Sequence, residues 1–195
     1  MKIKKLLITD VLSTSLWAGT TSIPLVTGWN AIGTNSNMVL DDIKTALGSS
    51  LLNIQSPDGT KTYNAASTKT QSFVNFETGI GYWVKVSDDA SLSVNEIDFT
   101  SSQTISMVSG WNLIDPLTNM TLDDIKTSLG SSLLNIQSPD GTKTYNSAST
   151  KTQSFVNFEA GLGYWIKLDS SADLVFSFDS NGSIETPPPT PDLNA

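Results

Sequence analysis

The side chains of this chain that could carry out chemistry are carboxylates, hydroxyls and lysines, because the sequence has no cysteine, no histidine and no arginine. Without cysteine or histidine there is no thiol nucleophile, no imidazole base and no common transition-metal site. Two carboxylates can hydrolyse a glycosidic bond, and a serine beside a lysine can attack an acyl group. The composition therefore permits these two classes of catalysis.

Four acidic residues occur twice in the chain, at a constant separation of 82 residues. The pairs are Asp41 and Asp123, Asp42 and Asp124, Asp58 and Asp140, and Glu77 and Glu159. The first two pairs stand where a helix is expected to begin, and acids favour the dipole of a first helical turn. The third pair lies in a turn, and a lone glutamate is usually a solvated surface residue. We therefore expect no enzymatic activity, no catalytic residue, no cofactor and no metal site.

The constant separation reflects an internal duplication, since the segment 28–94 reappears as 110–176. Surface and core positions match equally well, so the identity between the copies singles out no site. A fixed period usually means that one structural unit has been copied and stacked. The duplication favours a scaffold or binding module, with one repeat domain at 23–104 and a second at 105–178.

Each copy predicts the same order of elements, which begins with an apolar strand at 23–26. In the following Gly28-Trp29-Asn30 we expect the glycine to mark a bulge or a close backbone approach that turns Trp29 into the core. A short amphipathic helix should follow at 40–47. The second copy offers a threonine N-cap, Thr121, where the first copy has a valine, so the first helix should be less well capped.

A β-hairpin and a final strand complete each copy. The segments 51–55 and 60–64 flank Ser-Pro-Asp-Gly, in which proline presets the turn and glycine allows a positive φ. In the final strand at 81–86, Tyr82 and its alternate neighbours should face the core, and Trp83 and Lys85 should occupy the wetter face. We expect an α+β protein of two tandem similar small domains, each a mostly antiparallel β-sheet with one short helix.

The two ends of the chain have different patterns. Residues 1–22 have the pattern of a signal peptide, with three lysines before an apolar stretch and small residues after it. The alternative is an ordinary N-terminal strand or helix. Residues 179–195 are a Pro-rich linker or tail. The expected location is extracellular or at the cell surface. No run reaches the roughly 20 apolar residues of a membrane span, and a net charge of −8 argues against nucleic acid as a partner.

Two motifs resemble tandem repeat modules of bacterial secreted and cell-surface proteins. The motifs are Gly28-Trp29-Asn30 with Gly110-Trp111-Asn112, and Gly79-Ile80-Gly81-Tyr82-Trp83-Val84-Lys85 with Gly161-Leu162-Gly163-Tyr164-Trp165-Ile166-Lys167. The resemblance covers roughly residues 23–178. It implies an accessory or stalk domain and supplies no catalytic residues.

These observations predict a non-enzymatic exported module for surface attachment, display or spacing. One alternative is a carbohydrate-binding module that stacks sugar rings on Trp83 and Trp165, beside Lys85 and Lys167. Against it stands the interpretation that the repeat tryptophans are all core residues. Another alternative is a self-associating filament or matrix subunit. The partners would be an extracellular polysaccharide, further domains of a longer parent, or other copies of the chain.

Calcium is a separate possibility for an acidic exported protein, because its ligands are oxygen atoms. Neither an EF-hand spacing nor a Gly- and Asp-rich nonapeptide occurs in the sequence. The pair Asp88-Asp89 of the first copy is replaced by Ser170-Ser171 in the second. We therefore expect no calcium site that both copies share.

Overall fold

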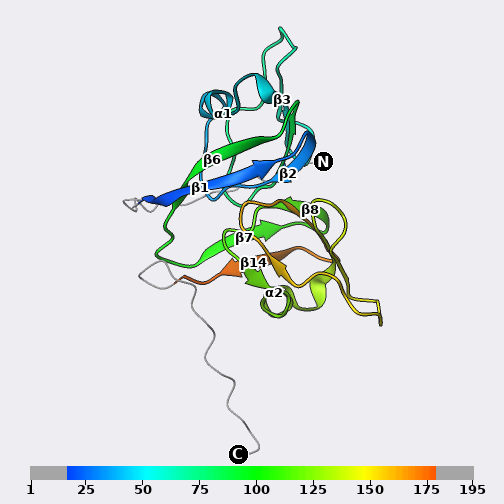
Figure 1. The fold of residues 1–195 in the computed structure, drawn as a ribbon. Helices are drawn as coiled ribbons and strands as arrows, with labels where there is room; N and C mark the ends of the chain where they lie inside the picture. The colour runs from blue at the N-terminus through cyan, green and yellow to red at the C-terminus, as the bar shows by residue number, and fades with distance from the viewer. Residues whose placement is uncertain (1–16, 179–195) are drawn as a thin grey trace, which may run out of the picture.

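The computed structural model describes residues 17–178, which form short antiparallel strands and two short helices (Figure 1). The elements of the first copy are β1 (Trp17–Leu25), β2 (Gly28–Ile32), α1 (Leu40–Leu47), β3 (Leu51–Gln55), β4 (Thr62–Asn64), β5 (Tyr82–Val86) and β6 (Ala90–Ile97). Those of the second are β7 (Gln103–Met107), β8 (Gly110–Ile114), β9 (Met120–Thr121), α2 (Leu122–Leu129), β10 (Leu133–Gln137), β11 (Thr144–Asn146), β12 (Asn157–Phe158), β13 (Tyr164–Leu168) and β14 (Ala172–Phe176). A single 3₁₀ turn follows each α-helix, at Gly48–Ser50 and Gly130–Ser132.

The expected signal peptide and Pro-rich tail lie outside the described residues, apart from 17–22, which belong to β1. The strand β1 pairs with β6 from Trp17 to Leu25, so it starts before the predicted 23–26. The small residues that suggest signal cleavage, in Ala18-Gly19-Thr20 and Thr20-Thr21-Ser22, fall inside this strand. Cleavage there would shorten the pairing of β1 with β6.

Each copy contains a four-stranded antiparallel sheet and a separate two-stranded sheet. The strand orders are β2-β5-β3-β4 in the first copy and β8-β13-β10-β11 in the second. The two-stranded sheets are β1-β6 and β7-β14, and the helices α1 and α2 contact β6 and β14 respectively. A further short pair joins β9 and β12. The described chain is therefore β-rich with two short helices, which fits the α+β class in its broad sense.

The helix and hairpin predictions are confirmed with small changes. The helix α1 ends before Gly48, whose φ is 54°. In α2 the Thr121 hydroxyl accepts a hydrogen bond from the Asp124 amide at 3.2 Å, whereas Val39 offers no side-chain cap to α1. The second hairpin strand begins at Thr62 rather than at 60, because the Thr60 amide donates to the Asp58 carboxylate at 3.1 Å and stays in the turn.

The expectation that Trp29 turns into the core is wrong. No atom lies within 4 Å of the place where a Cβ on Gly28 would be, but the φ of Gly28 is 105°. The glycine therefore serves a turn and not a close approach. The Asn30 amide closes this turn, since its Oδ1 accepts from the Val26 amide at 3.0 Å and its Nδ2 donates to the Val26 carbonyl at 2.8 Å. Trp29 then points away from Asn30 and is 47% exposed.

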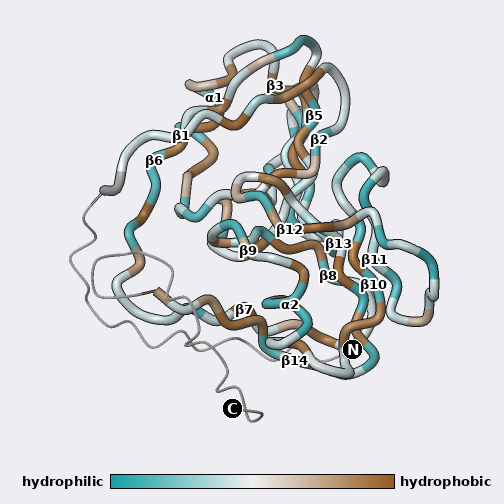
Figure 2. Tube along the Cα trace, turned by 60° about the horizontal axis from the view of Figure 1, so that its bottom comes forward, coloured by the Kyte–Doolittle hydropathy of each residue, from teal (hydrophilic) through white to brown (hydrophobic). Residues whose placement is uncertain are grey.

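Buried side chains form one cluster in each copy, between the four-stranded sheet and the elements that cover it. Alternate residues of β5, Tyr82, Val84 and Val86, are fully buried in the first cluster. Their counterparts on β13 take the same places in the second cluster. Figure 2 shows that hydrophobic stretches follow the strands, while many of the turns between them are hydrophilic. The predicted inward face of the final strand is confirmed.

Four backbone hydrogen bonds join the two copies reciprocally. The Gly81 amide donates to the Leu113 carbonyl at 3.1 Å, and the Gly163 amide donates to the Ala31 carbonyl at 2.9 Å. In the other two bonds the Asp115 amide donates to the Gly79 carbonyl at 3.2 Å, and the Gly33 amide donates to the Gly161 carbonyl at 3.3 Å. A Cβ on Gly81 would lie 2.9 Å from the Ile114 carbonyl oxygen. Gly81 therefore permits the close backbone approach at this contact.

One pair of equivalent residues breaks the reciprocity. Gly33 in the first copy corresponds to Asp115 in the second, and a Cβ on Gly33 would lie 2.1 Å from the Cβ of Asp115. The Asp115 side chain occupies the space that a side chain at position 33 would need. It is 1% exposed, and neither carboxyl oxygen has a hydrogen-bond partner among the described residues. Burial therefore raises the pKa of Asp115 well above its ordinary value.

Exchanging the two residues tests whether the contact is reciprocal. The single change Gly33→Asp presses a second carboxyl against Asp115 and should lower the free energy of unfolding by about 3 kcal/mol or more. The double change Gly33→Asp with Asp115→Gly moves the one side chain across the contact and should recover most of that loss. Urea denaturation of both variants measures the recovery. Equal losses in the two variants would contradict a reciprocal contact.

The burial of Asp115 also predicts a pH dependence. The folded state keeps its proton at pH values where the unfolded chain, with an ordinary pKa near 3.8, has lost it. Stability should therefore fall as pH rises above about 4 and through the raised folded pKa. Asp115→Asn removes this decrease in stability with rising pH. The variant should be more stable than the parent by about 1–3 kcal/mol at pH 8. Urea midpoints at pH 4 and pH 8 measure the difference, and a difference independent of pH would refute it.

Candidate functional site

The strongest candidate site is the outer face of each four-stranded sheet. On β5 the side chains of Trp83 and Lys85 alternate with buried residues and are both half-buried. In the antiparallel register Trp29 lies opposite Lys85 on one side, and Gln55 lies opposite Trp83 on the other. Because directly paired residues share a face of the sheet, these four side chains point outward together.

We call this surface the first aromatic face and define it by five residues: Trp29, Asn53, Gln55, Trp83 and Lys85. Asn53 pairs with Lys85 across β3 and β5 and is half-buried. The face thus combines two indole rings with two primary amides and one ammonium group. Flat apolar rings beside a few polar groups are typical of small-molecule binding surfaces.

The second copy repeats the arrangement. The second aromatic face consists of Trp111, Asn135, Gln137, Trp165 and Lys167. Here Trp111 pairs with Lys167, and Gln137 pairs with Trp165, in the same register as in the first copy. Trp111 is 49% exposed. All four sequence-predicted site residues, Trp83, Lys85, Trp165 and Lys167, therefore lie on these two faces.

The two faces differ in how their indole rings meet. In the second face the rings of Trp111 and Trp165 are edge to face, with centroids 6.3 Å apart and planes at 87°. In the first face Trp29, Gln55 and Trp83 line an open depression of about 390 Å³. The first face is therefore an open platform, and the second is a narrower aromatic corner.

A lysine ammonium lies over one indole ring of each face. Lys85 Nζ is 5.7 Å from the centroid of Trp29, and Lys167 Nζ is 5.8 Å from that of Trp111. These distances suit cation–π attraction, worth about 0.5–1 kcal/mol at exposed sites. The contacts place one ammonium group over an indole ring of each face.

Most acids shared by the copies have structural partners. Glu77, which was expected to be a surface residue, has a half-exposed side chain that forms an ion pair with Lys61. Its amide donates to the Tyr82 hydroxyl at 3.2 Å. Glu159 pairs with Lys143 at 3.1 Å in the same way. Within residues 17–178 no group of three or more acids is placed to hold a metal ion.

Asp58 and Asp140 stabilise the two hairpin turns through hydrogen bonds. The Ser56 hydroxyl donates to Asp58 at 2.5 Å and the Thr60 hydroxyl donates at 2.8 Å, and these bonds lower the pKa of Asp58. The corresponding bonds, led by that from Ser138, lower the pKa of Asp140 to about 2. Both carboxylates are exposed and remain charged at neutral pH.

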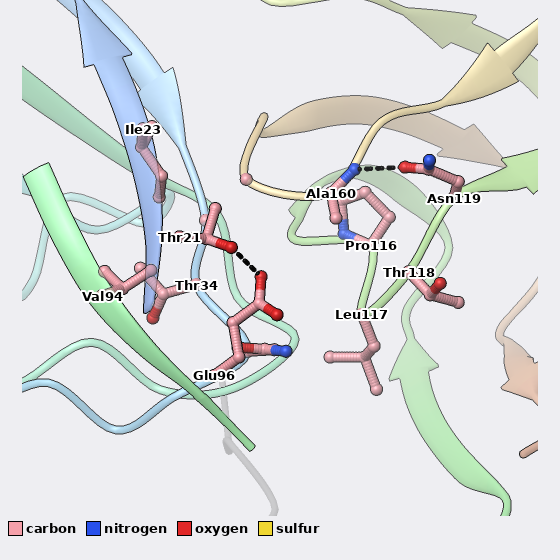
Figure 3. Close-up of a pocket in the computed structure, with 13 residues that line it drawn as sticks. Thr21, Ile23, Thr34, Val94, Glu96, Pro116, Leu117, Thr118, Asn119 and Ala160 are labelled. Atoms are coloured by element: carbon pink, nitrogen blue, oxygen red, sulfur yellow. Dashed lines mark hydrogen bonds between the residues drawn. The ribbon is translucent and has the colours of Figure 1, made fainter. Parts of the chain in front are cut away.

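A cleft of about 180 Å³ lies between the two copies and is the second candidate (Figure 3). Thr21 and Glu96 line it from the first copy, and Pro116 and Asn119 line it from the second. Several of its polar groups bond to the protein itself: Thr21 donates to Glu96, and Asn119 accepts from the Ala160 amide at 3.0 Å. Because the cleft also contains no aromatic ring, the aromatic faces are the better site.

The sequence predicted that Trp29 and Trp111 lie in the core. It therefore missed two of the four indole rings on the aromatic faces. The signal that could have found them is the alternation along β2, in which Asn30 and Ile32 share one side of the strand and Trp29 occupies the other. The pairing of Trp29 with Lys85 brings together residues far apart in sequence. No motif within one strand reveals that Trp29 pairs with Lys85.

No protein-family model, no curated protein and no solved structure matches this chain. In the part of the chain that the structure describes, neither helix is long and apolar enough to cross a membrane.

The exposure of the β2 and β8 tryptophans predicts that they contribute little to stability. Trp29→Ala and Trp111→Ala should each lower the free energy of unfolding by less than about 1 kcal/mol, since half-exposed side chains lose little burial. Tyr82→Ala is the buried control and should cost about 3–5 kcal/mol. Guanidinium denaturation compares the three variants. Losses at Trp29 as large as that at Tyr82 would place this ring in the core.

Proposed function

We propose that this chain is a non-enzymatic, exported tandem module that attaches to extracellular glycans through its two aromatic faces. The observation that carries the proposal is that two indole rings and an amide side chain share the outer sheet face of each copy. They are Trp29, Trp83 and Gln55 in the first copy, and Trp111, Trp165 and Gln137 in the second. Sugar rings present flat C–H surfaces that stack on indoles, and their hydroxyls bond to amides such as Gln55.

The proposal treats the two copies as two similar small domains, each with its own core and one glycan face. The reciprocal hydrogen bonds at Gly81 and Gly163 support a constant distance between the faces. Two weak sites at a constant spacing gain avidity on a polymer that spans both. A polysaccharide is therefore a better partner than a free monosaccharide.

Surface attachment, display and spacing remain the broader role within which glycan binding acts. The expected signal peptide and Pro-rich tail support export and connection to another domain or surface. The filament alternative would use the second edge of β7, because within the described residues β7 pairs along its length with β14 on one side only. A concentration-dependent sedimentation coefficient would favour that alternative over a glycan-binding monomer.

Tryptophan fluorescence of the whole chain, titrated with a panel of soluble polysaccharides, tests the proposal. Binding should shift the emission saturably, because the rings leave water when a sugar stacks on them. Trp83→Ala and Trp165→Ala should each weaken binding about tenfold. Val74→Ala, which changes an exposed apolar residue outside both faces, should have no effect. No response to any glycan class, with the parent chain folded, would refute glycan binding.

A further inference from the structure

The second aromatic face has a wall that comes from the first copy. A groove of about 240 Å³ is lined by Trp111 and Trp165 on one side and by Pro57 and Asp58 of the first hairpin turn on another. The floor includes Ile105 and Ile114. Because the turn belongs to one copy and the rings to the other, this groove exists only when the two copies are packed together.

Asp58 is the one charged residue that lines this groove in the described structure. Its carboxylate accepts hydrogen bonds from Ser56 and Thr60, which hold it in place and ionised at neutral pH. A carboxylate has about four lone-pair positions, and three of them are used in the turn. The remaining position can accept from a ligand donor.

A positively charged donor suits this groove better than a neutral or negative one. An ammonium beside Asp58 would form a charge-assisted hydrogen bond, which is stronger than a bond between neutral groups. The face of an indole ring attracts cations. Lys167 already occupies this position over Trp111, and no cation–π contact to Trp165 occurs in the described structure. The chain's net charge of −8 also attracts cationic polymers and repels anionic ones.

We propose that the groove between the Trp111–Trp165 corner and the Asp58 turn binds a sugar unit that carries a protonated amine. The sugar ring stacks on the indoles, and its ammonium donates to the Asp58 carboxylate. This inference rests on the glycan-binding function proposed above and names its ligand class, a polysaccharide with free amino-sugar units.

The first aromatic face lacks this charge. Its depression is lined by Trp29, Gln55 and Trp83, none of which is charged. The counterpart of Asp58 in the second copy, Asp140, lines a different depression with Lys143 and Leu162 and without a tryptophan. The preference for an amine therefore belongs to the groove at Asp58, and the first face stacks sugar rings without it.

The duplication provides a matched control for the test. Asp58→Asn and Asp140→Asn remove the same carboxylate from the same kind of turn, so they should have similar effects on stability. The whole chain is titrated at about pH 5.5, where Asp58 is ionised and amines are protonated, with an oligosaccharide of β-linked glucosamine. Asp58→Asn should weaken binding about tenfold, whereas Asp140→Asn should leave it unchanged.

The second ligand in this experiment is the fully N-acetylated oligosaccharide of the same length. Its neutral amides should bind more weakly than the free amines, and the two Asp variants should bind it equally well. Equal effects of the two variants on the amine ligand, or equal affinity of the parent for both ligands, would overturn the amine preference while leaving glycan binding intact. If neither oligosaccharide nor any polysaccharide binds the parent chain, the proposed function itself fails.

Discussion

The alternation of buried and outward side chains along β5 and β13 is the constraint on which the rest of the structure depends. Tyr82, Val84 and Val86 fill the first core, so Trp83 and Lys85 must point outward. A shift of one residue in this register would bury the lysine and expose the tyrosine. The core and the candidate glycan face are therefore set by one strand register in each copy.

A second constraint relates the two faces to each other. The close approach at Gly81 and Gly163 allows four backbone hydrogen bonds between the copies, and the Gly33 position leaves room for Asp115. An unpartnered buried carboxyl is costly, so the contact is not optimised for stability alone. It does bring the Asp58 turn of one copy against the tryptophans of the other.

Local patterns predicted much of this arrangement from the sequence. Apolar spacing predicted α1, turn chemistry predicted the β3–β4 hairpin, and alternation predicted the inward side of β5, because each depends on neighbours within a few residues. The position of Trp29 was missed because Gly28 predicted a close backbone approach, whereas Asn30 closes a turn there and the alternation along β2 directs the indole outward. The groove at Asp58 could not be predicted from the sequence, because it depends on packing between residues far apart in the chain.

The most direct test of the account is to follow the indole N–H signals of the five tryptophans by nuclear magnetic resonance while an amino-sugar oligosaccharide is added. The account predicts that the signals of Trp111 and Trp165 shift first and saturate together. The signals of Trp29 and Trp83 should shift at higher concentration, since that face lacks the carboxylate. Indole signals that stay unchanged while the oligosaccharide binds would contradict the aromatic faces as the site.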